Sequence, residues 1–228
     1  MNIITIVGAR PQFVKAAVVS REISTHDDIH ETIIHTGQHF DPNMSDLFFE
    51  EMRIPAPGYN LNINSLSHGA MTGKMLEEIE KVLLDKKPNW VLVYGDTNST
   101  LAGALAAKKL HIRVAHVEAG LRSFNMTMPE EINRILTDRV SDILFCPTET
   151  ATRNLQNEGF DHFDSRVVLS GDVMLDAALF YRQYSRPPQI ELKRDFVLAT
   201  LHRAENTDTP EYLSEIIRAL ETISREQD

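Results

Sequence analysis

The sequence lacks the residues on which covalently stabilised folds depend. It contains one cysteine, Cys146, among 228 residues, so no disulfide can form within the chain. Cysteines and histidines with the spacing of a zinc site are also absent. A chain of this length buries roughly 70–75% of the surface that its unfolded form exposes, so a hydrophobic core can stabilise it without such links. This cysteine usage fits a reducing, cytoplasmic location.

Long hydrophobic runs and an excess of positive charge are missing as well. The apolar run at residues 1–8 has no basic leader and is far shorter than the roughly 18 residues of a membrane span. Lys and Arg number 23 against 33 Asp and Glu, which gives a net charge of −10. Such a chain repels nucleic acids and anionic membranes, so we expect neither as a partner.

Short apolar segments rich in β-branched residues alternate with longer segments of helical period. This alternation predicts an α/β fold with a mostly parallel sheet covered by helices on both faces. The predicted strands are 3–8, 32–37, 90–96, 114–119, 143–147, 167–171 and 196–201. The predicted helices are 11–24, 43–52, 67–86, 99–110, 129–141, 149–158, 173–183 and 210–225.

A break in this pattern near Pro187 and Pro188 indicates two domains. We expect an N-terminal Rossmann-like domain over 1–171, a linker over 172–190 and one strand–helix unit over 191–228. A lone strand and helix cannot bury an apolar face. The unit therefore either adds to the edge of the first sheet or begins a second domain that is cut short, and we favour the second explanation.

Charged residues follow the first predicted strand, at the edge where open α/β sheets bind ligands. Arg10 and Lys15 flank a helix N-terminus, which fits either a phosphate site or an ordinary turn with two solvated cations. The dinucleotide fingerprint G-x-G-x-x-G is absent, and the second strand ends in His35-Thr36-Gly37 where an acidic ribose ligand would be expected. A nicotinamide cofactor is therefore not expected.

Two carboxylates follow the next strands. Asp96 ends the strand 90–96, where it can face a ligand or cap the following helix. Glu118 lies in an otherwise apolar strand, which is costly unless the carboxylate is used or is paired, with Arg122 as the nearest candidate. Both positions are candidates for chemistry as well as for structure.

Two further charged groups complete the set. Glu131 lies in the first turn of the helix 129–141, where Glu130 and Arg134 also fit an i, i+4 pair. His202 and Arg203 follow the last predicted strand, either as a solvated loop or as part of a site. Three carboxylates with two cationic groups and no metal or redox motif indicate acid–base chemistry beside a bound polyphosphate.

Taken in order, five motifs resemble the non-hydrolysing UDP-N-acetylglucosamine 2-epimerases. They are G-A-R-P-Q-F-V-K-A (8–16), G-D-T-N-S-T (95–100), H-V-E-A-G-L-R (116–122), P-E-E-I-N-R (129–134) and H-R-x-E-N (202–206). The resemblance implies a GT-B fold of two Rossmann-like domains, a UDP-sugar in the cleft between them, no cofactor, a homodimer and a cytoplasmic role in surface polysaccharide synthesis. Proteins of this family are longer, so the resemblance also favours a truncated chain that is inactive alone.

The resemblance further implies that C2 of the sugar is inverted through elimination of UDP, a 2-acetamidoglucal intermediate and re-addition of UDP. Asp96 is then the first choice for proton transfer, with Glu118 and Glu131 as partner acid or base or as stabilisers of the electron-poor ring. Arg10, Lys15 and His202 would hold the diphosphate. His202 would also be a catalytic residue, together with the three carboxylates. The other implied substrate-binding residues are Arg122, Arg134, Arg203, Glu205 and Asn206.

Gln38 and His39 match a stretch that binds a second, activating UDP-sugar in bacterial members of this family. The segment 40–46 differs from the basic version found in that subgroup, which leaves both allostery and the sugar open. UDP-2,3-diacetamido-glucuronic acid is an alternative substrate. A GT-B glycosyltransferase, which would need an acceptor, is an alternative enzyme class.

Overall fold

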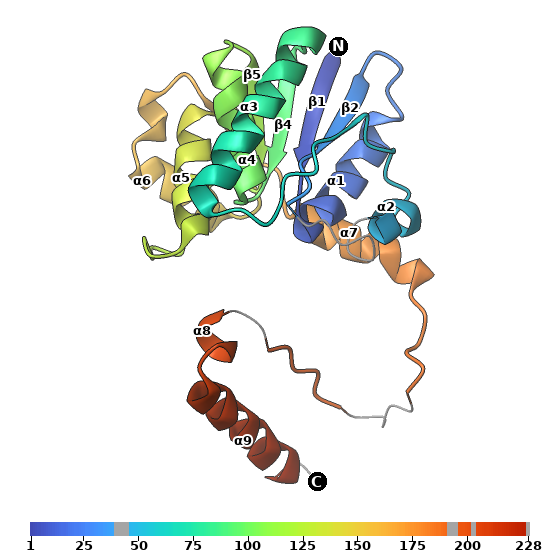
Figure 1. Cartoon of the computed structure of the whole chain (residues 1–228), viewed down its shortest axis with the longest axis vertical. Helices are drawn as coiled ribbons and strands as arrows, with labels where there is room; N and C mark the ends of the chain where they lie inside the picture. Colours follow the sequence, from blue (N-terminus) through green and yellow to red (C-terminus); the bar gives the residue numbers. More distant parts are fainter. Residues whose placement is uncertain (39–45, 191–195, 202–203, 227–228) are drawn as a thin grey trace. The chain divides into compact units, whose positions relative to one another are not determined.

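The computed structural model describes residues 1–38, 46–190, 196–201 and 204–226. The chain divides into two compact units, Met1–Ser185 and Arg186–Asp228. The first unit contains most of the secondary structure (Figure 1).

The first unit is built on a seven-stranded sheet in which every described pair of neighbours is parallel. Its order is β3-β2-β1-β4-β5-β6-β7. The chain thus steps outward from β1 in one direction and from β4 in the other, which makes the β1–β4 boundary the switch point where ligands bind in such sheets. The strands are β1 (Asn2–Val7), β2 (His30–His35), β3 (Tyr59–Asn60), β4 (Trp90–Tyr94), β5 (Arg113–Val117), β6 (Ile143–Cys146) and β7 (Arg166–Leu169).

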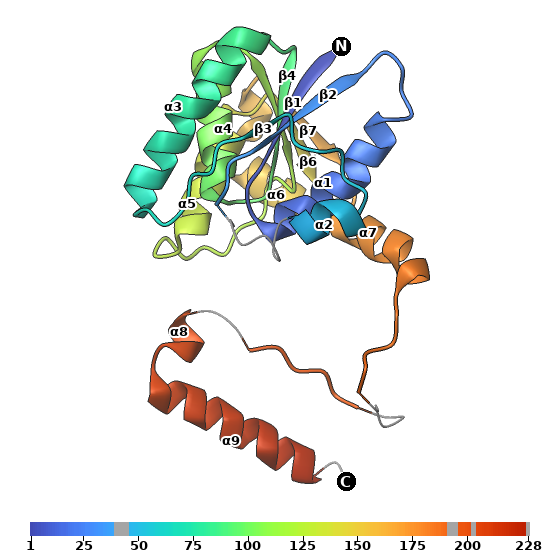
Figure 2. The ribbon, with the colours of Figure 1, turned by 45° about the vertical axis from the view of Figure 1, so that its right-hand side comes forward.

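Helices cover both faces of this sheet (Figure 2). On one face lie α3 (His68–Lys86), α4 (Asn98–Lys109), α5 (Pro129–Val140) and α6 (Glu149–Asn157); on the other lie α1 (Arg10–Ile23), α2 (Asp46–Glu51) and α7 (Val173–Tyr181). Short 3-10 turns occupy Phe160–His162 and Arg182–Tyr184. The doubly covered parallel sheet predicted from the sequence is confirmed.

Strand β4 shows how the apolar pattern becomes two cores. Val91 and Val93 pack with α3 and α4, whereas Leu92 and Tyr94 pack with Phe13 of α1. Successive side chains of a strand point to opposite faces, so a continuous apolar run is the pattern that a strand between two helical layers requires.

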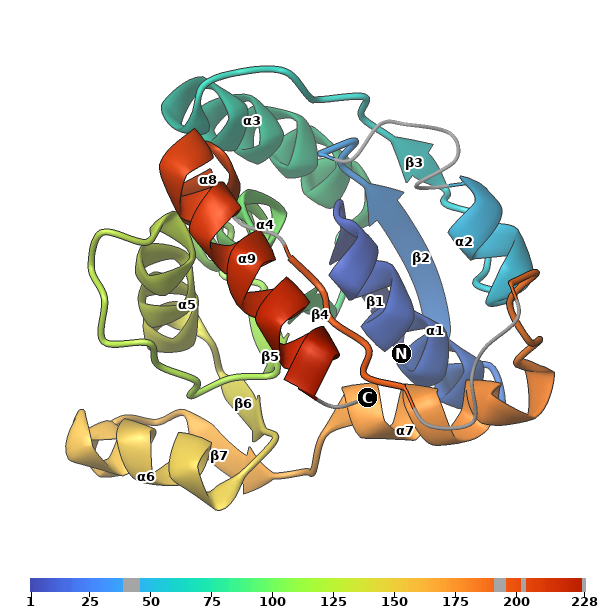
Figure 3. The same ribbon diagram turned by 90° about the horizontal axis from the view of Figure 1, so that it is seen from below.

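Helix α7 belongs to the first unit, because Val173 and Tyr181 pack into the core under α1 and the two helices lie side by side (Figure 3). The Tyr181 hydroxyl also donates a hydrogen bond of 2.7 Å to the carbonyl of Met52. The first unit therefore extends to Ser185, which lies within the linker expected over 172–190.

The second unit contains α8 (Ala204–Thr207) and α9 (Pro210–Glu226). The helix predicted over 210–225 is confirmed, but the strand predicted over 196–201 is not formed. Phe196, Val197 and Leu198 are exposed there. A strand exists only when it bonds to a neighbour, and none of the described strands pairs with this apolar segment.

Candidate functional site

The carboxyl ends of β4 and β5 meet in a tight corner beside α1. Gly95, directly after β4, donates a backbone hydrogen bond of 3.0 Å to Val117, the last residue of β5. Gly95 adopts a left-handed conformation with φ +62°. A Cβ atom at this position would lie 3.1 Å from both Glu118 Oε2 and Lys15 Nζ, so glycine leaves the room that these two side chains use.

Lys15 and Glu118 form an ion pair in this corner. Their side chains are 8% and 19% exposed, respectively, so the pair is sheltered but open on one side. Glu118 has φ +70°, a conformation that is uncommon for a residue with a side chain and that concentrates at functional sites. Arg10 is exposed at the start of α1. Lys15, one of the three predicted diphosphate ligands, is thus held by a carboxylate.

Asp96 forms the neighbouring ion pair, with Arg134 of α5. The Asp96 side chain stays 34% exposed. Asn133 donates from Nδ2 to the main-chain oxygen of Asp96 at 2.9 Å and to Asn98 Oδ1 at 3.2 Å. Asp96 is therefore fixed from both its backbone and its carboxylate. Asn98 and Asn133 lay inside the quoted motifs but were not singled out by sequence, because an amide gives no sign of its partner.

Glu131 is the most constrained carboxylate of the site. Its Oε2 accepts hydrogen bonds from Ser123 N, Ser123 Oγ and Arg134 at 2.9–3.0 Å, and Oε1 accepts from Phe124 N at 2.8 Å. Burial by itself would raise the pKa of Glu131, but these bonds and the charge of Arg134 outweigh it and lower the pKa. Such a carboxylate is suited to holding the 123–124 backbone and Arg134 in place.

Arg122 lies in a different environment from the one expected. Its guanidinium is 1% exposed and donates to Glu158 at 2.6 and 2.8 Å and to Asp138 at 2.7 Å. The considered Glu118–Arg122 pair does not occur, because Lys15 takes that place. Arg134 likewise pairs with Glu131 and Asp96, in place of the considered i, i+4 partner Glu130.

Glutamine side chains organise the helix starts around the site. The buried Gln12 accepts from Gly8 N and Ala9 N at 2.8 and 3.1 Å, and it donates to the carbonyl of Tyr94 at 2.9 Å. Gln38, predicted as an activator ligand, accepts from Ser99 N and Oγ at 3.3 and 2.9 Å. Gln12 was not predicted from the sequence, where only its position in the first turn of α1 could have pointed to it.

The remaining predicted site residues lie at the edges of what the structure describes. His39, His202 and Arg203 fall outside the described residues, as does the side chain of Glu205. Asn206 belongs to α8 in the second unit. The first unit therefore supplies Asp96, Glu118, Glu131, Lys15 and Arg134 as one group, with Arg122 behind it.

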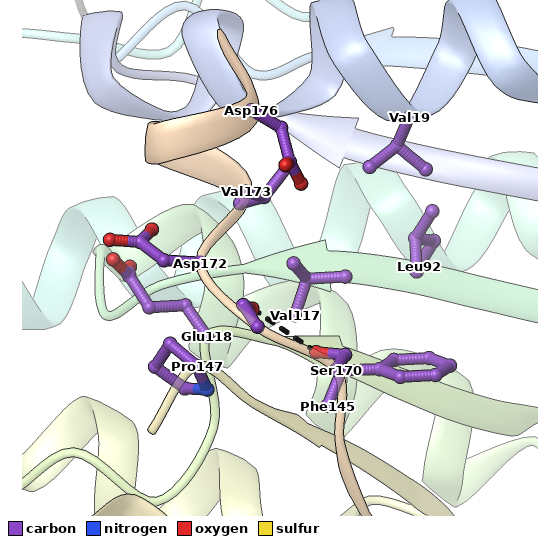
Figure 4. Close-up of a pocket in the computed structure, with 11 residues that line it drawn as sticks. Val19, Leu92, Val117, Glu118, Phe145, Pro147, Ser170, Asp172, Val173 and Asp176 are labelled. Atoms are coloured by element: carbon purple, nitrogen blue, oxygen red, sulfur yellow. Dashed lines mark hydrogen bonds between the residues drawn. The ribbon is translucent and has the colours of Figure 1, made fainter. Parts of the chain in front are cut away.

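A pocket of about 230 Å³ opens next to Glu118 (Figure 4). Val19, Leu92, Val117 and Phe145 form apolar walls, Asp172 brings a carboxylate beside Glu118, and Asp176 in the first turn of α7 adds another carboxylate to the lining. Among the described residues, no group of three or more His, Cys, Asp or Glu is placed to hold a metal ion, and no helix could span a membrane.

The sequence profile of one protein family, described as UDP-N-acetylglucosamine 2-epimerase, matches residues 21–228. The chain belongs to this family. The match extends from α1 to the end of the chain and includes four of the five motifs in full.

Individual relatives of the UDP-N-acetylglucosamine 2-epimerase family agree with this assignment. The chain is 62% identical to the UDP-2,3-diacetamido-2,3-dideoxy-D-glucuronate 2-epimerase of Pseudomonas aeruginosa, over 98% of this chain and 63% of that protein. It is 57% identical to a UDP-N-acetylglucosamine 2-epimerase homolog of Methanococcus maripaludis, over 96% of this chain and 62% of that protein. The chain thus spans about three fifths of the length of these relatives.

Among solved structures, the UDP-GlcNAc 2-epimerase of Methanocaldococcus jannaschii in complex with UDP-GlcNAc and UDP superimposes with a TM-score of 0.90 at 46% identity. It covers 100% of this chain, which covers 64% of that one. The expectation of a GT-B, Rossmann-like fold is confirmed by this likeness.

Proposed function

We propose that the protein inverts C2 of a UDP-linked 2-acetamido sugar. The observation that carries the proposal is the pair of carboxylates Asp96 and Glu118 at adjacent strand ends, each beside its own cation and each still partly exposed. Two carboxylates with separate partners can hold different protonation states while a substrate lies between them, as transfer of a proton from one face of a carbon to the other requires.

The chemistry of C2 dictates what else is needed. A C2 proton without an adjacent carbonyl is weakly acidic, so its removal has to accompany cleavage of the C1–O bond, whose electrons leave with UDP. Elimination gives UDP and a 2-acetamidoglucal. Re-addition of UDP at C1, with a proton delivered to the opposite face of C2, completes the inversion, and holding both fragments together avoids a diffusive encounter.

The residues divide this work by their accessibility. Asp96 is our first choice for proton transfer at C2, with Glu118 as the acid or base on the other side. Glu131 holds Arg134, which in turn steadies Asp96. Arg10, Lys15 and His202 stabilise the departing diphosphate, where positive charge is worth most; Lys15 can do so only by sharing its charge with Glu118.

Two sugars are candidates for the substrate. We favour UDP-2,3-diacetamido-2,3-dideoxy-D-glucuronate, because the relative named for it is 62% identical to this chain, against 57% for the relative named as a UDP-N-acetylglucosamine 2-epimerase homolog. UDP-N-acetylglucosamine is the second candidate. Action in the cytoplasm, as a homodimer, on precursors of surface polysaccharide completes the proposal.

Proton NMR in D2O tests it with both UDP-sugars. We expect deuterium to enter C2 and signals of the 2-epimer to grow, either with this chain or with one carrying the remaining two fifths of its relatives' length. Asp85→Asn, which removes an exposed surface carboxylate, is the matched control for a substitution at Asp96, and this variant should catalyse C2 exchange at the unaltered rate. Absence of exchange in both chain lengths, with the first unit folded, would refute the proposal. Stoichiometric release of UDP that depends on an acceptor would indicate a glycosyltransferase instead.

A further inference from the structure

His116 lies in the middle of the sheet, on β5, and its side chain is fully buried. Both of its ring nitrogens have close partners. Nδ1 is 2.7 Å from Asp138 Oδ1, and Nε2 is 2.7 Å from the carbonyl oxygen of Gly95. This histidine is separate from the candidate catalytic and binding groups at the edge of the sheet.

The partners decide where the ring protons are. A carbonyl oxygen can only accept, so Nε2 carries a hydrogen. Asp138 Oδ2 already accepts from Gly120 N at 3.1 Å and from Arg122 at 2.7 Å. Two donors on Oδ2 and the positive charge of Arg122 favour the carboxylate form of Asp138 against its burial, so Oδ1 is an acceptor too and Nδ1 also donates.

Charge balance supports the same assignment. Arg122 contacts two carboxylates, Asp138 and Glu158, so this group carries one positive and two negative charges without His116. A cationic His116 brings the sum to zero. Buried ions are tolerated when they are paired and fully hydrogen-bonded. Here both ring nitrogens of His116 and both carboxylate oxygens of Asp138 have hydrogen-bond partners.

We propose that His116 is a buried imidazolium that positions the two proton-transfer carboxylates. Its Nε2–H fixes Gly95, the residue directly before Asp96, while Asp138, held by its Nδ1–H, fixes Gly120, two residues after Glu118. One cation thus joins the backbones that follow β4 and β5. The titratable and charged groups facing it are Asp138 from α5 and, behind that carboxylate, Arg122. The catalytic part of this inference rests on the proposed epimerase function; the protonation state does not.

Nitrogen-15 NMR of the histidine rings tests the protonation state in the wild-type chain. We expect both ring nitrogens of His116 to carry a hydrogen in the folded chain at about pH 7.5, where an ordinary histidine is mostly neutral. A backbone-to-ring correlation assigns the signal without any substitution, and the other histidines of the nine serve as references in the same spectrum. A neutral ring with one unprotonated nitrogen at that pH would overturn the proposal.

Kinetics tests the positioning role in a chain that shows C2 exchange. His116→Gln keeps a donor but cannot donate on both sides, so we expect kcat to fall about 100-fold while KM changes less than about threefold. The matched control is Leu144→Ala, a buried neighbour of His116 on β6 that destabilises the same region without touching these hydrogen bonds.

The two variants separate positioning from mere stability. Equal losses of kcat in His116→Gln and Leu144→Ala, or an unchanged kcat in His116→Gln, would refute the positioning role. If no chain shows C2 exchange, the proposed function fails while the NMR result still decides whether His116 is an imidazolium.

Discussion

Two groups of charged residues, one buried and one at the edge of the sheet, differ in how far their side chains are exposed. The buried group contains His116, Arg122 and Asp138, whose side chains are 0–1% exposed, with Glu158 at its rim. The edge group contains Lys15, Asp96, Glu118 and Arg134, whose side chains are 8–34% exposed. Both groups pair cations with carboxylates.

The difference lies in where each residue stands relative to a strand end. His116 is inside β5, whereas Glu118 follows the strand and has a positive φ. Inside the sheet a charge has to be neutralised by the protein itself. Past the strand end it can exchange partners with water or a ligand. Residues of one short motif are therefore placed differently: His116 is held inside the fold by the protein's own groups, and Glu118 stands where water or a ligand can reach it.

The largest effect should come from the edge group. In a chain that shows C2 exchange, Asp96→Asn keeps the shape of the side chain but removes the proton acceptor, so we expect C2 exchange to fall about 10³- to 10⁴-fold. Binding of UDP should persist, because the diphosphate cations are unaltered. Deuterium incorporation and UDP titration measure the two effects separately. C2 exchange at the wild-type rate would show that Asp96 takes no part in the mechanism. The edge group would then have no demonstrated chemical role that sets it apart from the buried group.

The buried group should show the next largest effect, on stability. Asp138→Asn leaves His116 and Arg122 without their shared carboxylate, and breaking a buried ion pair costs about 3–5 kcal/mol. Urea unfolding followed by fluorescence of Trp90, the only tryptophan, reports on the first unit. Asp85→Asn, with a side chain 68% exposed, is the control and should leave the midpoint unchanged. A loss as small as the control's would show that the buried group contributes no stability.

Glu31 sharpens the comparison as a half-buried carboxyl whose hydrogen bond comes from a neutral hydroxyl group, that of Thr5. Burial raises its pKa, and the hydrogen bond from Thr5 only partly offsets this. The native state then binds the proton more tightly than the unfolded state, so stability from this group is present at low pH and is lost as pH rises through the raised pKa. Glu31→Gln should therefore be neutral near about pH 4 and stabilising near about pH 7.

Urea midpoints at the two pH values measure this effect. Glu22→Gln, at a site with a side chain 76% exposed, is the control and should show no such pH dependence. An equal gain for Glu31→Gln at both pH values would contradict a raised pKa for this carboxyl in the native state.

The smallest effect should come from exposed ion pairs. Hydrogen bonds with Glu78 and Glu77 raise the pKa of Lys74 to about 12, but all three side chains are solvated. Water and salt screen such pairs, and the mobile side chains lose entropy when they pair. Lys74→Ala should leave the urea midpoint unchanged within error. A fall in the urea midpoint as large as that expected for Asp138→Asn would show that ion pairing contributes more to stability than burial does.

Much of the fold was readable from the sequence because local pattern and layer agree. The apolar β-branched run at β4 and the 3.6-residue period of α3 each predicted an element within a few residues of its observed bounds. Strand β3 escaped notice because two residues carry no period. The segment 196–201 has the composition of a strand yet forms none, since β structure also needs a neighbour.

The sequence by itself determined which residue types stand after each strand, and so the candidate chemistry of the site. Only the tertiary structure decided their partners: Lys15 for Glu118, Arg134 for Asp96 and Asp138 for both His116 and Arg122. These partners are up to 103 residues apart in the chain. Spacing along a sequence fixes contacts only within one helix or strand, whereas the order of strands in the sheet decides which loop ends meet.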